Sequence, residues 1–161
     1  MKNDKFLIGI VIGILILVVV AIGVVLMREQ TESYIADDSP AGVVHNYFLA
    51  IQRQDYDKAY GYLSNDIKSK PDLDDFILVV DNYGDRPESS LQVGETTIDD
   101  NRAQVRASIT TYRGGGNLFD SGSYTSRDTA HLRATPDGEW KLIQFPYPYW
   151  GYNWNEPKDL D

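Results

Sequence analysis

The sequence predicts an α+β protein with one N-terminal transmembrane helix, followed by helices and then by a curved antiparallel sheet. Two observations indicate this order: an uninterrupted apolar run over residues 6–27, and a change of hydrophobic period from three or four residues to two after Pro87. The 161-residue chain leaves about 120 residues for one domain with its own core.

The apolar run extends from Phe6 to Met27 and contains no charged or hydrogen-bonding side chain in its 22 residues. As a helix rising about 1.5 Å per residue it would cover about 33 Å, and the hydrocarbon core of a bilayer is about 30 Å thick. A cleaved secretory signal has a shorter apolar region, and the nearest cleavage-like sequence, Ala21-Ile22-Gly23, lies inside the run. We therefore expect an uncleaved anchor.

The charges beside the run predict its orientation. Lys2 and Lys5 precede it together with one acid, Asp4, whereas acids predominate after Arg28. The positive-inside rule then leaves residues 1–5 as a cytoplasmic tail. The protein is expected in the cell membrane as a single-pass protein with its C-terminal domain extracytoplasmic.

Gly9 and Gly13 stand four residues apart within the run, on one face of the expected helix. Such a pair lets two helix backbones approach closely and would permit weak homo-association through the span. Because glycine is common in transmembrane helices, an anchor without a helix partner is the favoured alternative.

The remainder of the chain is acidic. Three of the 15 basic residues and one of the 24 acidic residues lie within residues 1–28, so 12 basic and 23 acidic residues remain, a formal charge of −11. This charge repels phosphate backbones, and no nucleic-acid partner is expected. The absence of cysteine excludes disulfides and a lipid-modified cysteine. The acidic pairs lack calcium-loop spacing, so neither a metal ion nor a cofactor is predicted.

Residues 28–38 are polar and predict a linker, and the folded domain is expected over residues 39–146. Ser39 before Pro40 is a typical helix start, and apolar residues then recur at three- and four-residue spacing until about Arg53.

Two shorter helices are expected next, one after Asp55 with a break at residues 64–66, and one after Asp72. Alternating apolar and polar residues then predict a sheet with one apolar and one wet face. Its four strands are expected over residues 91–98, 102–112, 124–134 and 140–145.

Three short motifs occur together in this domain: a Ser-Pro start to the first helix, an Asp-Tyr pair before the second and a Gly-x-Trp start to the last strand. They are Ser39-Pro40, Asp55-Tyr56 and Gly138-Glu139-Trp140. With them, residues 39–145 resemble the nuclear transport factor 2-like superfamily, and most of all its bacterial membrane-attached domains of unknown function. The resemblance implies a cone of helices on a curved sheet. Since this fold hosts enzymes, binding modules and adaptors, it implies no activity.

Few titratable residues are catalytic candidates. His45 lies about 130° around its helix from the apolar stripe, and His131 shares a strand face with two arginines, so both are expected at the surface. Enzymes of the resembled superfamily typically place an Asp, His or Tyr inside the cone. Asp128 is the one acid on the expected inner strand face, beside Tyr124, and these two are the remaining candidates.

Six aromatic residues lie within residues 145–154, interrupted by two prolines and a glycine that exclude a regular helix or a central strand. The favoured interpretation is that the tail, residues 147–161, folds back and buries its rings. The other interpretation is a contact surface for an envelope protein, a glycan or a small-molecule ligand. Its candidate residues are Tyr147, Tyr149, Trp150, Tyr152 and Trp154.

Two classes of function are therefore compared. The first is a non-enzymatic, membrane-anchored binding or interaction module of the bacterial envelope. The second is a small-molecule enzyme of isomerase or dehydratase type that uses the cone pocket, as the resemblance and Asp128 suggest. An apolar cavity with Asp128 and Tyr124 in its wall favours the enzyme, whereas an interior filled by aromatic side chains favours the binding module.

Overall fold

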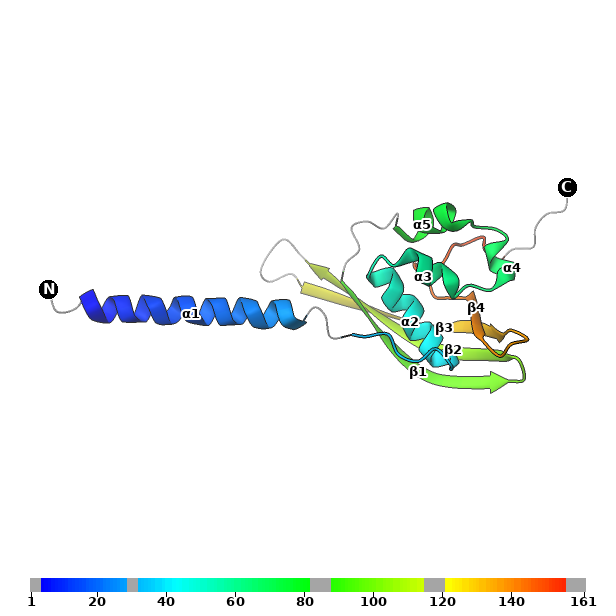
Figure 1. Cartoon of the computed structure of the whole chain (residues 1–161), viewed down its shortest axis with the longest axis horizontal. Coiled ribbons are helices and arrows are strands. Elements are labelled where there is room, and N and C mark those ends of the chain that lie inside the picture. Colours follow the sequence, from blue (N-terminus) through cyan, green and yellow to red (C-terminus); the bar gives the residue numbers. More distant parts are fainter. Residues whose placement is uncertain (1–3, 29–31, 82–87, 115–120, 156–161) are drawn as a thin grey trace. The chain divides into compact units, whose positions relative to one another are not determined.

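The computed structural model describes residues 4–28, 32–81, 88–114 and 121–155. The chain divides between Ser33 and Tyr34 into two compact units. The first contains helix α1, and the second contains the other helices and the sheet (Figure 1).

The first unit contains helix α1, Asp4–Arg28, which has 25 residues. Its side chains are described over residues 8–23, and large apolar groups are exposed on successive residues, with Leu17 at 70% and Val19 at 67%. Among residues with described side chains, no helix is long and apolar enough to cross a membrane.

Helix α2, Pro40–Gln52, begins where the sequence predicts, because the Oγ of Ser39 accepts the Gly42 N–H at 3.1 Å. Helix α5, Leu73–Asp81, likewise starts after Asp72, whose Oδ1 accepts a backbone N–H at 2.9 Å.

Helix α3, Tyr56–Gly61, lies where a second helix is expected, but Asp55 forms no side-chain cap. The Asp55 carboxylate instead accepts the Tyr34 hydroxyl at 3.2 Å. The break expected at residues 64–66 is the start of a further short helix, α4, Asn65–Lys68, because the Ser64 Oγ accepts a backbone N–H in its first turn.

Four antiparallel strands form one sheet in the order β1-β2-β3-β4, as predicted. Their bounds are Ser89–Asp99, Arg102–Gly114, Ser121–Ala134 and Trp140–Gln144. Asp100 and Gly138 have positive φ, 53° and 86°, in the tight turns before β2 and β4. Because β4 pairs with β3 only from His131 onward, the first part of β3 extends past β4.

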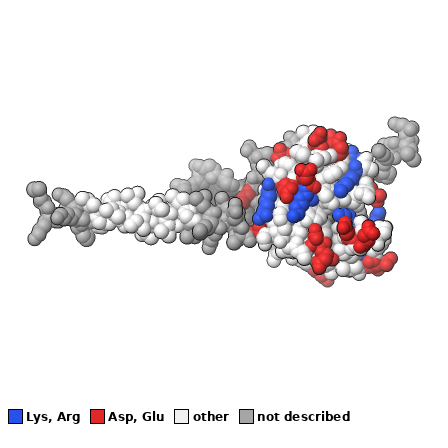
Figure 2. Space-filling view, viewed as in Figure 1, with Lys and Arg blue, Asp and Glu red and all other residues white. Residues whose placement is uncertain are grey.

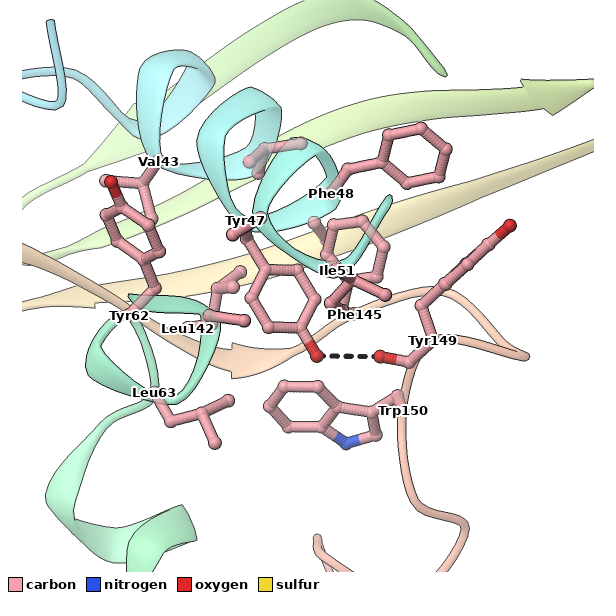
Figure 3. Close-up of a cluster of buried hydrophobic side chains, with 14 of the residues drawn as sticks. Val43, Tyr47, Phe48, Ile51, Tyr62, Leu63, Leu142, Phe145, Tyr149 and Trp150 are labelled. Atoms are coloured by element: carbon pink, nitrogen blue, oxygen red, sulfur yellow. Dashed lines mark hydrogen bonds between the residues drawn. The ribbon is translucent and has the colours of Figure 1, made fainter. Parts of the chain in front are cut away.

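Helix α2 packs on the inner face of the curved sheet (Figure 1). Figure 3 shows side chains from α2, β4 and the C-terminal tail meeting there. An isolated bridge between Leu63 and Leu142 joins the residues before α4 to the edge of β4. The largest fully buried side chains of this core include Tyr47, Phe48, Phe76, Ile51, Leu132 and Leu142.

Residues 34–38 of the predicted linker lie on the domain. The side chain of Asn46, which is 1% exposed, bonds both the N–H and the C=O of Ile35. The Tyr62 hydroxyl donates to Asp37 at 3.3 Å. The compact unit thus begins at Tyr34, five residues before the predicted start at Ser39. Residues 29–31 of the predicted linker are outside the described residues.

Candidate functional site

Aromatic side chains fill the space between the helices and the sheet. Tyr47 and Phe76 are 0% exposed and Phe48 is 2% exposed. The Tyr47 hydroxyl donates to the backbone oxygen of Tyr149 at 2.7 Å, so this buried polar group has a partner (Figure 3). Trp140 is half-buried and packs against the same cluster.

Asp128 and Tyr124 lie on the inner strand face that the sequence predicts, because Asp128 pairs with the buried Ala107 and Tyr124 pairs with Thr111. Both are nevertheless solvent-exposed, with Tyr124 at 67%. They belong to the part of β3 that extends past β4, where the alternation of the strand continues. Asp128 accepts the backbone N–H of Thr129 at 2.7 Å.

The two histidines lie on different elements. His45 is half-buried on α2, and His131 is half-buried on the outer face of β3, opposite Gln104. The register therefore places His131 on the polar side of the sheet, whereas α2, which carries His45, packs on the inner face.

The described part of the tail, residues 147–155, folds back onto the domain. Tyr149, Trp150 and Trp154 are 4%, 6% and 4% exposed, whereas Tyr147 and Tyr152 are 66% and 94% exposed. The Trp154 ring stacks on Phe76 with centroids 5.6 Å apart and meets Trp150 edge-on at 5.1 Å. Three of the five contact-surface candidates are thus core residues. Residues 156–161 lie outside the described residues.

A groove that the sequence did not predict lies where α4 meets the edges of β3 and β4. Its centre is the ion pair between Arg133 and Asp66, at 2.7 Å, and we call it the Arg133 groove. Two hollows adjoin this pair, with volumes of about 570 and 510 Å³. The larger hollow is also lined by Ser69, Lys70, His131, Gln144, Trp154 and Asn155.

The smaller hollow is lined by Lys68, Arg133 and Lys141, together with Asp66, Asp137 and Glu139 among others. Lys141 forms an ion pair with Glu139 at 3.0 Å. Burial lowers the pKa of Lys68 below its usual value, and the neighbouring charge of Lys141 lowers it further. The cations are therefore close enough to repel one another.

Strand register explains part of this crowding. Arg133 lies directly opposite Arg102 on β2 and directly opposite Lys141 on β4, so three cations form a row across the outer face. Alternation alone indicates that each of the three points outward. Alternation does not predict the register that places the three side chains next to one another. It also does not predict helix α4, which brings Lys68 close to Arg133 and Lys141.

Comparison with solved structures finds similar folds. A SEC-C motif containing protein from Rhodopseudomonas palustris matches with a TM-score of 0.54 and 17% identity, over 68% of this chain and 79% of that protein. A ketosteroid isomerase-like protein from Erwinia carotovora atroseptica matches with a TM-score of 0.47 and 14% identity, over 62% and 85%. A protein of the NTF2-like family from Streptomyces avermitilis matches with a TM-score of 0.45 and 14% identity, over 62% and 86%.

No family model and no curated protein matches the sequence. At 17% identity, the likeness to the SEC-C motif containing protein shows the fold alone. The structure confirms the predicted order of helices followed by a curved, four-stranded antiparallel sheet.

Proposed function

We propose that this chain is a single-pass membrane protein whose C-terminal domain lies outside the cytoplasm and acts as a non-enzymatic binding module of the bacterial envelope. The observation that carries the proposal is the surface of α1. Its described side chains are apolar and exposed, and Figure 2 draws neither acidic nor basic groups on that stretch. A continuous apolar surface of this kind requires a partner or a lipid environment.

The proposal of a span rests on the whole sequence run from Phe6 to Met27, which extends beyond the described side chains on both sides. Twenty-two apolar residues suffice for a bilayer, and sixteen, residues 8–23, would be short. The lysines before the run and the acids after it support a cytoplasmic N-terminus.

The binding role has more support than the enzymatic alternative. The interior of the cone is occupied by Tyr47, Phe48 and Phe76, and the candidates Asp128 and Tyr124 are exposed to solvent. The two hollows of the Arg133 groove lie instead along the outer edge of the sheet, where cationic and hydrogen-bonding groups gather. A groove that combines apolar lining with a few charged and hydrogen-bonding side chains suits recognition of a ligand.

The natural absence of cysteine allows a direct test of the membrane topology. Asn3→Cys and Ser123→Cys should be compared in intact bacterial cells with a membrane-impermeant maleimide. We expect labelling of the Ser123→Cys chain in intact cells, and of the Asn3→Cys chain only after permeabilisation. The opposite pattern would reverse the proposed orientation.

Attachment itself is tested by alkaline carbonate extraction of the membranes. The unchanged chain should remain in the pellet, whereas a chain with Leu15→Arg and Val18→Arg should be released, because two charges at the centre of the run make insertion costly. Release of the unchanged chain would contradict the anchor.

A further inference from the structure

We propose that the Arg133 groove binds a phosphorylated sugar or polyol, with the phosphate held by Lys68, Arg133 and Lys141 and the hydroxyl-bearing part in the larger hollow. This inference gives the proposed binding role a ligand class, and it rests on that role rather than on membrane attachment. The groove lies outside the space between the helices and the sheet.

The first support is the arrangement of like charges. Arg102, Arg133 and Lys141 are direct cross-strand neighbours on one face of the sheet. Like charges directly opposite each other destabilise a sheet, so this row favours the approach of anionic groups. The chain as a whole has a net charge of −9, so a row of three cations differs from its acidic composition.

The second support is Lys68, which projects from α4 toward the same row. It forms no ion pair with the residues that the structure describes, and its Nζ atom lies 5.1 Å from the centroid of the Tyr60 ring. Burial and the charge of Lys141 both act against its protonated form. A bound anion would offset both effects.

The counter-ions already present leave room for a ligand. Asp66 pairs with Arg133 and Glu139 pairs with Lys141, but the two acidic side chains are 71% and 68% exposed. Exposed ion pairs contribute little to stability, so these carboxylates can turn toward water at little cost when a stronger anion arrives. The smaller hollow provides about 510 Å³ beside the cations.

The number and spread of donors favour phosphate. Three cationic side chains approach from three elements, α4, β3 and β4, and a phosphate monoester offers three charged or partly charged oxygens to them. The adjoining hollow, about 570 Å³, is lined by Ile67, Ile143 and Trp154 and by several side chains that donate or accept hydrogen bonds and suit hydroxyl groups. They include Ser69, His131, Gln144 and Asn155.

The test is calorimetric titration of the full chain in non-ionic detergent with glucose 6-phosphate, glucose and inorganic phosphate. We expect glucose 6-phosphate to bind at least tenfold more tightly than inorganic phosphate, and glucose to give no measurable binding. Equal affinity for inorganic phosphate and glucose 6-phosphate would overturn the placement of hydroxyls in the larger hollow. Absence of binding by both phosphates would overturn the site.

Variants locate the binding. Lys68→Gln and Arg133→Gln should each weaken glucose 6-phosphate binding at least tenfold. Arg106→Gln is the matched control, because Arg106 is also an outward arginine with an exposed carboxylate partner, Glu95 at 3.3 Å, but does not line either hollow. Unchanged affinity in Lys68→Gln, or equal weakening in the control, would contradict the assignment.

Thermal unfolding without ligand separates binding from folding. If Arg133→Gln fails to fold, Lys68→Gln decides the question, because it breaks no ion pair within the described residues. The maleimide experiment reports topology independently, so loss of phosphate binding and loss of membrane attachment are distinguishable outcomes.

Discussion

The side-chain amide of Asn46 bonds the backbone of Ile35 at two points: its Oδ1 accepts the Ile35 N–H at 3.0 Å, and its Nδ2 donates to the Ile35 carbonyl at 2.7 Å. Gly42, one turn earlier on α2, makes the approach of this segment feasible, since a Cβ there would clash with the Ala36 carbonyl. The residues that lead into the domain are therefore part of its fold.

Asn46→Ala should lower the free energy of unfolding by about 1–3 kcal/mol, because it leaves two backbone groups of Ile35 without their partner. Chemical denaturation of the full chain in detergent measures this loss. Gln92→Ala, at an exposed polar position on β1, should change the free energy by less than about 0.5 kcal/mol. Equal effects in the two variants would show that residues 34–38 contribute nothing to stability.

Phe48 fills the centre of the interface between α2 and the sheet and packs edge-on against Tyr149, with ring centroids 5.0 Å apart. Phe48→Ala should therefore destabilise the domain by about 3–5 kcal/mol, since a buried ring is replaced by a cavity. Leu78→Ala is the control, because Leu78 is a large apolar residue that is 64% exposed on α5. A loss below about 1 kcal/mol for Phe48→Ala would contradict its burial.

Alkaline pH should destabilise the domain through Tyr62. Burial is the main cause that raises the pKa of Tyr62 above its usual value of 10.0, and the nearby Asp37 carboxylate adds to it. Above about pH 10 the unfolded chain loses a proton that the folded chain retains, so stability is complete below this pH and falls as pH rises toward the raised pKa. Denaturation midpoints between pH 8 and 11 should fall less steeply in Tyr62→Phe. An unchanged slope would exclude Tyr62 as a cause.

Capping residues in the local sequence predicted two helix starts correctly. The predicted cap failed where a residue distant in sequence bonds the capping side chain. Ser39 and Asp72 cap their helices with groups three residues away, so nearby sequence is sufficient. Asp55 is an aspartate like Asp72, but its carboxylate accepts a hydrogen bond from the hydroxyl of Tyr34, 21 positions earlier, and does not cap α3. The short helix α4 was not predicted, because a single turn has too few positions for a periodic pattern.

The Arg133 groove could not be predicted for a related reason. Asp66 and Arg133 are 67 positions apart, and their contact depends on the bridge that places Leu63 beside Leu142. Alternation gave the correct face for Arg133, Tyr124 and Asp128 alike. It could not tell that β4 pairs with β3 only from His131 onward, so that Asp128 and Tyr124 lie beyond the paired part of β3.

The tail offers the sharpest test of the core. Trp154 lies between Phe76 and Trp150, and Gly151 allows its indole to approach the backbone, since a Cβ at that position would clash with the ring. Trp154→Ala should cost about 3–5 kcal/mol, whereas Tyr152→Ala, at a position that is 94% exposed, should cost less than about 0.5 kcal/mol.

Ending the chain after Phe145 removes all the buried rings of residues 147–155 at once and leaves the Tyr47 hydroxyl without the carbonyl of Tyr149. Even a loss of 2 kcal/mol lowers the melting temperature of a domain of this size by about 8 °C. We therefore expect the melting temperature of the truncated chain in a thermal scan to be at least about 8 °C lower than that of the intact chain. Tyr47→Phe should lower the melting temperature less, because it removes only the hydrogen bond to Tyr149. A truncated chain that melts within a degree of the intact one would show that the tail is a separate contact surface and not part of the core.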